Sequence, residues 1–190
     1  AIHLDHGHYD DALECIEVGY TSIMFDGSHL PVEENLAKAK EVVELAHAKG
    51  ISVEAEVGTI GGEEDGIIGS GELAPIEDAV AMVATGIDFL AAGIGNIHGP
   101  YPANWEGLDL DHLKKLTEAV PGFPIVLHGG SGIPDEQIQA AIKLGVAKVN
   151  VNTECQIAFA NATRKFAAAY EANAKIITAV DEMLQTLLDM

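Results

Sequence analysis

The alternation of short apolar runs with longer segments of helical periodicity constrains the fold of this chain most strongly. In the helical segment 32–49, for example, Leu36, Val43 and Ala46 fall at helical spacing. Almost continuously apolar strands that alternate with helices are typical of a parallel sheet covered by helices. The predicted strands are residues 1–6, 22–26, 52–57, 89–95, 124–128 and 148–151.

Composition and charge exclude several kinds of partner. Thirty acidic residues against ten basic ones give a formal net charge of −20, so nucleic acid and anionic membranes are poor partners. No apolar run approaches the ~20 residues of a membrane span, and the sequence shows no basic region followed by a hydrophobic stretch at its start, so we expect a cytoplasmic location. Cys15 and Cys155 stand far apart without a CxxC spacing, which does not support a zinc knuckle or a disulfide framework.

Polar and ionisable residues gather where the predicted strands end. In a parallel α/β protein, the carboxyl ends of the strands form the edge at which sites are built. His6, His98 and His128 end three different strands, and each stands beside a glycine. One such histidine is more often structural, but three match a catalytic zinc site that keeps one position open. Carboxylates stand at equivalent positions: Asp5, Asp26 and Glu56.

The segment 128–132, with the sequence HGGSG, predicts a phosphate site. Small residues between a strand and a helix expose backbone N–H groups to an anion. The next strand supplies Asn150, Asn152 and Thr153, and in (β/α)₈ barrels two such adjacent loops commonly bind phosphate. Together with the histidines, this arrangement predicts a phosphorylated substrate near a zinc ion.

Two other segments have more than one interpretation. The glycine-rich loop 58–71 contains the acidic cluster at 63–65 and is either a solvated connection or a lid over the site. Lys148 could form a Schiff base with a carbonyl substrate. It stands at the start of its strand, however, so we expect it to project away from the predicted site.

The strand-end motifs occur in a recognisable order: LDHG at 4–7, VEAEVG at 53–58, GNIHG at 95–99, VLHGGSG at 126–132 and KVNVNTE at 148–154. Taken together over about residues 1–169, they closely resemble the class II, metal-dependent fructose-bisphosphate aldolases. The resemblance implies an α/β fold of the TIM-type (β/α) barrel. At 190 residues the chain is shorter than the ~250 of a closed barrel, so we expect six of the eight strand–helix units, with the first two missing.

The resemblance also implies an activity and a metal. Family members reversibly cleave fructose 1,6-bisphosphate to dihydroxyacetone phosphate and glyceraldehyde 3-phosphate, in glycolysis and gluconeogenesis. It assigns the catalytic zinc to His6, His98 and His128, and an alternate metal position to Glu56 with Asp26 nearby. Na⁺ or K⁺ would assist at the phosphate site. The partners implied are the sugar bisphosphate and further copies of the chain, in a dimer or tetramer.

The same resemblance assigns roles around the metal. Asp5 would be the base for the C4 hydroxyl, and Glu64 the mobile residue that exchanges the C1 proton, with Glu63 the less favoured choice. A tagatose-bisphosphate aldolase remains an alternative, although the loop 58–66 looks more like the fructose-specific form. The dihydroxyacetone phosphate portion would be bound by Gly99, Gly129, Ser131, Asn150, Asn152 and Thr153.

Residues 170–190 depart from the aldolase pattern and resemble the C-terminal helix of bacterial flagellar rod and hook proteins. We therefore expect two parts, an aldolase barrel portion at 1–169 and an amphipathic helix of different origin at 170–190. This helix would pack on its own domain or form an intermolecular coiled contact. A catalytically incompetent partial barrel that acts as a structural or assembly component is a further alternative. The apolar positions are Ile177, Val180, Leu184, Leu187 and Leu188.

Overall fold

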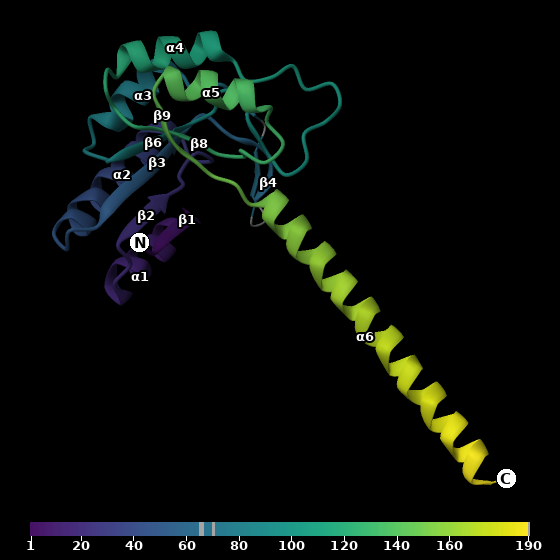
Figure 1. The fold of residues 1–190 in the computed structure, drawn as a ribbon. Helices are drawn as coiled ribbons and strands as arrows, with labels where there is room; N and C mark the ends of the chain where they lie inside the picture. Colours follow the sequence, from purple (N-terminus) through teal and green to yellow (C-terminus); the bar gives the residue numbers. More distant parts are fainter. Residues whose placement is uncertain (65–66, 70, 190) are drawn as a thin grey trace. The chain divides into compact units, whose positions relative to one another are not determined.

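The computed structural model describes residues 1–64, 67–69 and 71–189. Its main element is a six-stranded parallel sheet in the order β1-β2-β3-β6-β8-β9, which leaves β1 and β9 at the two edges (Figure 1). The six strands agree with the six predicted ones, and the partial TIM-type α/β fold is confirmed. Their bounds are β1 His3–Gly7, β2 Ser22–Phe25, β3 Ser52–Val57, β6 Phe89–Ala92, β8 Ile125–Leu127 and β9 Val146–Val149.

Five helices connect and cover these strands, as expected for successive β/α units. Asp109 begins one of them by accepting a hydrogen bond from the backbone N–H of His112 at 2.8 Å, which is a side-chain N-cap. The helices are α1 Tyr9–Val18, α2 Val32–His47, α3 Ile76–Val83, α4 Leu110–Ala119 and α5 Asp135–Lys143.

The two faces of the sheet differ in chemistry because side chains alternate along each strand. On β3, Val53, Ala55 and Val57 join the main hydrophobic core with the helices. Glu54 and Glu56 point to the other face and are nevertheless buried. Met24, Ala91 and Val126 form a small apolar cluster separate from that core. The inner face of the curved sheet therefore combines apolar side chains with buried carboxylates.

Part of the segment 58–71, which we expected to be a loop, belongs to a second, three-stranded sheet. In it, β4 (Gly61–Glu64) pairs antiparallel with β5 (Ile67–Gly69) and parallel with β7 (Ile97–His98). The pattern of glycines and acids hides the two-residue periodicity by which strands are normally recognised. The side chains of Glu63 and Glu64 lie outside the described part of the structure, so the role expected for Glu64 stays a prediction.

Residues 152–190 form a second compact unit, separate from residues 1–151. This unit is built on one helix, α6 (Thr153–Leu188), which has 36 residues and no buried side chain. The helix runs without a break through position 169, where we placed the boundary between the two predicted parts. No helix within the described residues has the length and apolar character needed to cross a membrane.

Candidate metal centre

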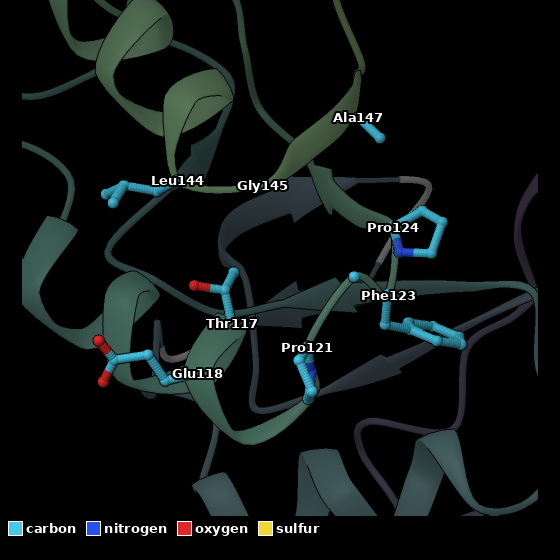
Figure 2. A pocket seen from close by; sticks show the side chains of 9 residues that line it. Thr117, Glu118, Pro121, Phe123, Pro124, Leu144, Gly145 and Ala147 are labelled. Carbon is cyan, nitrogen blue, oxygen red and sulfur yellow. The ribbon is translucent and has the colours of Figure 1, made fainter.

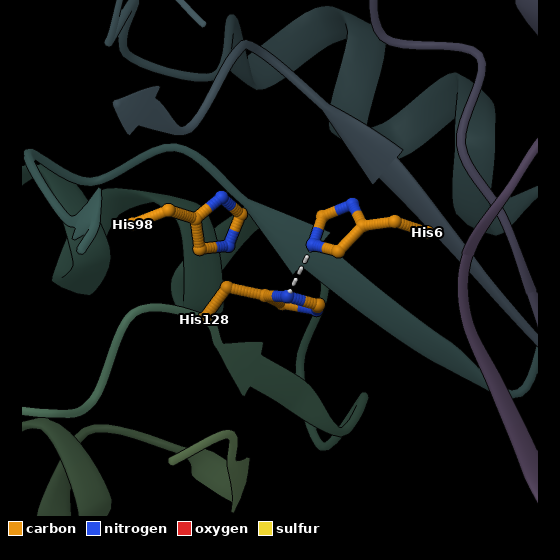
Figure 3. Close-up of side chains that lie close together, drawn as sticks. All are labelled: His6, His98 and His128. Atoms are coloured by element: carbon orange, nitrogen blue, oxygen red, sulfur yellow. Dashed lines mark hydrogen bonds between the residues drawn. The ribbon is translucent and has the colours of Figure 1, made fainter. Parts of the chain in front are cut away.

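Three imidazoles from three parts of the sheet system lie together. His6 lies one residue before the end of β1, His98 ends β7 and His128 follows β8. The Nε2 atom of His6 lies 2.9 Å from Nδ1 of His128 (Figure 3). The centroids of the His6 and His98 rings are 4.7 Å apart. One nitrogen from each of the three rings lies within 4.8 Å of the others. The strand-end residues predicted as metal ligands are thus brought to one point, although they are up to 122 positions apart in the sequence.

A bulge in β1 explains how two consecutive residues, Asp5 and His6, both reach this site. In a regular strand they would point to opposite faces. The pairing of β1 with β2 shifts register between Leu4 and Gly7, and His6 has a φ of 49°, in the left-handed region. Such bulges reorient side chains and are frequent next to active sites. This one turns His6 inward while Asp5 stays exposed and accepts a hydrogen bond from Asn150 at 3.1 Å.

Two buried carboxylates face the other nitrogen of His6. Asp26 Oδ2 lies 2.8 Å from His6 Nδ1, and Ser28 donates two hydrogen bonds to Asp26 Oδ1. Glu56 Oε2 lies 3.9 Å from the same nitrogen and has no hydrogen-bond partner among the described residues. His6, Asp26 and Glu56 form a second cluster with one ligand atom each within 4.8 Å. An unpartnered buried carboxylate oxygen is costly, and a cation would satisfy it.

Electrostatic interactions shift the pKa values of these groups strongly. Burial alone would lower the pKa of His6, but its hydrogen bond to Asp26 and the charge of Glu56 raise it to about 9. The same bond, together with the two hydrogen bonds from Ser28, outweighs burial at Asp26 and lowers the pKa of that carboxyl to about 2. Burial and the nearby charge of Asp26 raise the pKa of Glu56 to about 8. Burial beside His6 and His128 lowers the pKa of His98 to about 4.

A second network lies beneath His128. Glu54 Oε1 is 2.8 Å from Nε2 of His128, and Lys148 Nζ donates to Glu54 Oε2 at 2.6 Å. Burial opposes ionisation of Glu54, but these two partners outweigh it and lower its pKa. Lys148 therefore reaches toward the site rather than away from it, which corrects our expectation. Its amine is engaged by a carboxylate, which agrees with the view that it is not a Schiff-base residue.

The residues predicted to bind phosphate lie partly around this centre. Gly129 follows His128 directly and has a φ of +66°. Ser131 stands three positions after His128 in the sequence and is buried. The side-chain nitrogen of Asn150 lies 3.3 Å from His128 Nδ1 as well as donating to Asp5. Gly99 follows His98 and also has a positive φ, of +84°. Asn152 and Thr153 belong to the second compact unit, so their part in the site stays a prediction.

Two residues that the sequence analysis did not select hold the histidine loops together. Asn96 donates to the backbone oxygen of His128 at 3.0 Å and accepts from the backbone N–H of Ile94 at 2.9 Å. Tyr101 donates from its hydroxyl to the Gly129 oxygen at 2.8 Å and accepts from the Ile97 N–H at 3.0 Å. Asn96 stands within the GNIHG motif and could have been selected on that ground. Tyr101 has no comparable signal in the sequence.

Gly129 is expected to be the most sensitive glycine of this loop. A Cβ atom there would lie 2.2 Å from the backbone oxygen of Ile97, and the φ of +66° already disfavours a side chain. We expect Gly129→Ala to lower the free energy of unfolding by about 1–3 kcal/mol more than Gly122→Ala, in urea titrations. Gly122 has a φ of +75° but open space around it, so it isolates the effect of the contact. Equal losses in the two variants would contradict this expectation.

A separate hollow of about 620 Å³ lies at the amino ends of β8 and β9 (Figure 2). Because all six strands run parallel, this is the edge of the sheet opposite the histidines. In barrels of this type, residues at the amino ends of the strands usually contribute to the stability of the fold, whereas the chemistry takes place at the carboxyl ends. Its lining includes Thr117, Phe123, Pro124, Leu144 and Ala147.

A partial (β/α) barrel with three imidazoles and buried carboxylates at the carboxyl ends of its strands defines a protein of the metal-binding TIM-barrel class. The profile of the family described as class-II fructose-bisphosphate aldolase matches residues 1–190. The chain belongs to that family, which confirms the resemblance seen in its motifs. Membership implies a bound divalent metal.

Individual relatives agree with this assignment. The chain is 93% identical over 173 residues to a fructose-bisphosphate aldolase of Streptococcus pneumoniae serotype 4, covering 91% of this chain and 59% of that protein. It is 87% identical over the same length to that of Streptococcus pyogenes serotype M3, with the same coverage of 91% and 59%. The crystal structure of the YdjI aldolase from Escherichia coli K12 matches with a TM-score of 0.71 and 38% identity, covering 85% of this chain and 57% of that one. The chain thus spans about 59% of the length of the curated relatives.

Proposed function

We propose that this chain carries the metal face of a zinc-dependent aldolase that reversibly cleaves fructose 1,6-bisphosphate to dihydroxyacetone phosphate and glyceraldehyde 3-phosphate. The observation that carries the proposal is the convergence of His6, His98 and His128, with one nitrogen of each within 4.8 Å of the others. The S. pneumoniae and S. pyogenes relatives described above are named as fructose-bisphosphate aldolases, which favours the fructose over the tagatose substrate.

The donor set fits a zinc ion. Asp26 engages Nδ1 of His6, and Glu54 engages Nε2 of His128. The remaining nitrogens, His6 Nε2 and His128 Nδ1, face each other at 2.9 Å. Carboxylates that bind the outer nitrogen of a histidine orient the ring and set the tautomer needed for metal binding. Both rings are therefore prepared to donate to one ion, with His98 as the third ligand.

A bound zinc ion would act as a Lewis acid that polarises the substrate carbonyl and stabilises negative charge developing on its oxygen. Asp5, exposed at the rim and oriented by Asn150, would accept the proton of the C4 hydroxyl as the C3–C4 bond breaks. Glu64, on β4 of the hairpin, would exchange the proton at C1. Phosphate binding is assigned to Gly99, Gly129, Ser131, Asn150, Asn152 and Thr153.

The cluster of His6, Asp26 and Glu56 would serve as the alternate metal position. It shares His6 with the first cluster, and the unpartnered Oε2 of Glu56 is available to a cation. A monovalent ion, Na⁺ or K⁺, would assist at the phosphate site.

A direct test measures aldol cleavage by the purified 190-residue chain after loading with zinc. We expect triose phosphate from fructose 1,6-bisphosphate, little from tagatose 1,6-bisphosphate, and no activity in a chelator. Borohydride should trap no adduct, because no lysine forms a Schiff base. Cleavage that persists in the chelator, or a substrate adduct on Lys148, would overturn the proposal. So would a fully zinc-loaded chain that cleaves neither sugar.

Zinc binding is expected to release about one proton at pH 7. Metal-binding nitrogens must be unprotonated, and the pKa of about 9 leaves His6 protonated at pH 7 when no ion is bound. Affinity should therefore rise about tenfold per pH unit as the pH approaches that pKa. Calorimetric titrations in buffers with different ionisation enthalpies measure the proton count. Affinity that does not change between about pH 6 and 8 would contradict the assignment of His6 as a ligand.

A further inference from the structure

Lys148 lies at the centre of a hydrogen-bonded network on the inner face of the sheet, and the proposed chemistry does not use its amine. The amine donates to Oε2 of Glu54 at 2.6 Å and to Nε2 of His3 at 3.2 Å. Three strands meet in this contact, because Lys148 belongs to β9, Glu54 to β3 and His3 to β1. Since β9 and β1 are the two edges of the sheet, one amine links side chains from both edges to its interior.

The carboxylate of Glu54 has a different partner on each of its two oxygens. Its side chain is 0% exposed, and Oε1 accepts a hydrogen bond from Nε2 of His128 at 2.8 Å. Oε2 accepts from Lys148. An ionised carboxylate can only accept hydrogen bonds, and a buried one that lost a partner would keep an uncompensated oxygen. The amine of Lys148 therefore holds in place the carboxylate that faces His128.

The other nitrogen of His128 faces a hydrogen-bond donor. The side-chain nitrogen of Asn150 lies 3.3 Å from Nδ1 of His128, and it also donates to the carboxylate of Asp5 at 3.1 Å. An amide nitrogen only donates, so Nδ1 of His128 must be the accepting nitrogen of the ring. With an acceptor at Nε2 and a donor at Nδ1, His128 carries its proton on Nε2 and presents the lone pair of Nδ1 to the site.

His3 holds the amine of Lys148 from the side opposite Glu54. Nδ1 of His3 lies 2.9 Å from the hydroxyl of Ser22, and Nε2 accepts from Lys148. Burial and the charge of Lys148 lower the pKa of His3, which agrees with a neutral ring that can accept this bond. Only 33% of the Lys148 side chain is exposed. The amine is thus held between two partners, unlike that of a mobile surface lysine.

We propose that Lys148 is a positioning residue for the metal centre, which acts through Glu54 to fix the ring orientation and the tautomer of His128. The inference rests on the proposed zinc site and extends it to a residue that is assigned neither to the ion nor to the sugar. A positive charge near a bound cation repels it, so charge alone would make zinc binding stronger when the amine is removed. Loss of positioning would make zinc binding weaker. The two effects have opposite signs, and a measurement of affinity separates them.

Zinc affinity of the full chain, measured by competition with a chromogenic chelator, tests this role. We expect Lys148→Met, which keeps a long side chain but removes the amine, to bind zinc about ten- to a hundredfold more weakly. The matched control Lys143→Met removes the same charge from an exposed position on α5 and should bind zinc as the wild type does. Urea titrations check that each variant is folded. Unchanged or stronger zinc binding by Lys148→Met would overturn the proposal.

The ring nitrogens of His128 give a second readout, which depends neither on zinc nor on catalysis. In proton–nitrogen correlation NMR spectra of the metal-free chain, with the signals assigned by His128→Gln, the wild type should show one tautomer with its proton on Nε2. Lys148→Met should show both tautomers in exchange, whereas Lys143→Met should keep the wild-type pattern. Either a wild type without the Nε2 tautomer or a Lys148→Met variant that keeps it alone would overturn the role of Lys148. A wild type that binds zinc and shows this tautomer but cleaves no sugar would overturn only the proposed function.

Discussion

Replacing His98 by alanine is expected to abolish zinc-dependent aldol cleavage. His98 is the least constrained of the three imidazoles because it is only partly buried, whereas His6 and His128 are buried. It contacts both of the other rings. Its loss removes one of three nitrogen ligands, which should weaken zinc binding on the order of a hundredfold or more. The Lewis acid supplies several kcal/mol of transition-state stabilisation, so kcat/KM should fall on the order of 10³-fold or more.

The measurements are zinc content after dialysis and triose phosphate production in the same sample. His47→Ala provides the matched control, since His47 is an exposed histidine on α2 that bonds Asp88 at 2.9 Å, away from the site. That variant should keep both zinc and activity. If His98→Ala retained stoichiometric zinc with wild-type affinity, the three-histidine centre would be wrong.

The second large effect is expected for Asp5→Asn, and it should appear in kcat alone. Asp5 lies at the rim of the site, and its two carboxylate oxygens accept from Asn150 at 3.1 and 3.2 Å. Asparagine keeps the shape but cannot accept the proton of the C4 hydroxyl. Removing a general base typically costs 10²–10⁴-fold in rate, so we expect a fall of about that size.

Zinc content and KM separate this role from that of the histidines. Both should stay near the wild-type values in Asp5→Asn, because the residue is not assigned to the metal or to phosphate. Asp111→Asn, an exposed substitution at the start of α4, controls for the change of charge. A variant that lost zinc together with activity would show that Asp5 supports the metal centre instead of acting as the base.

The parts of the site that the sequence predicted well share one physical origin. Parallel strands bring all their carboxyl ends to one edge, so residues at strand ends meet without any knowledge of the packing. His6, His98 and His128 could be grouped on that basis alone. The same reasoning placed Asp26 and Glu56 near them, as the structure now shows.

The parts that the sequence did not predict depend on where a backbone deviates or which way a long side chain turns. Alternation along β1 gives no reason for Asp5 and His6 to share an edge, and only the bulge at His6 brings this about. Lys148 lies within β9, and its position in the strand did not indicate that its long, flexible side chain reaches Glu54 beneath His128. The antiparallel pairing of β4 with β5 was hidden because neither of their sequences, GGEE and IIG, shows the apolar alternation typical of a half-buried strand.

The sequence by itself determined the parallel α/β order, the strand-end histidines and the amphipathic repeat of α6, because each depends on local periodicity or on residue type. The tertiary structure alone decided which nitrogen of His6 and which nitrogen of His128 is not engaged by a carboxylate. That choice follows from Asp26 binding Nδ1 of His6 and Glu54 binding Nε2 of His128. These contacts join positions 20 and 74 residues apart, and hydrogen bonds over such separations are set by packing and not by local pattern.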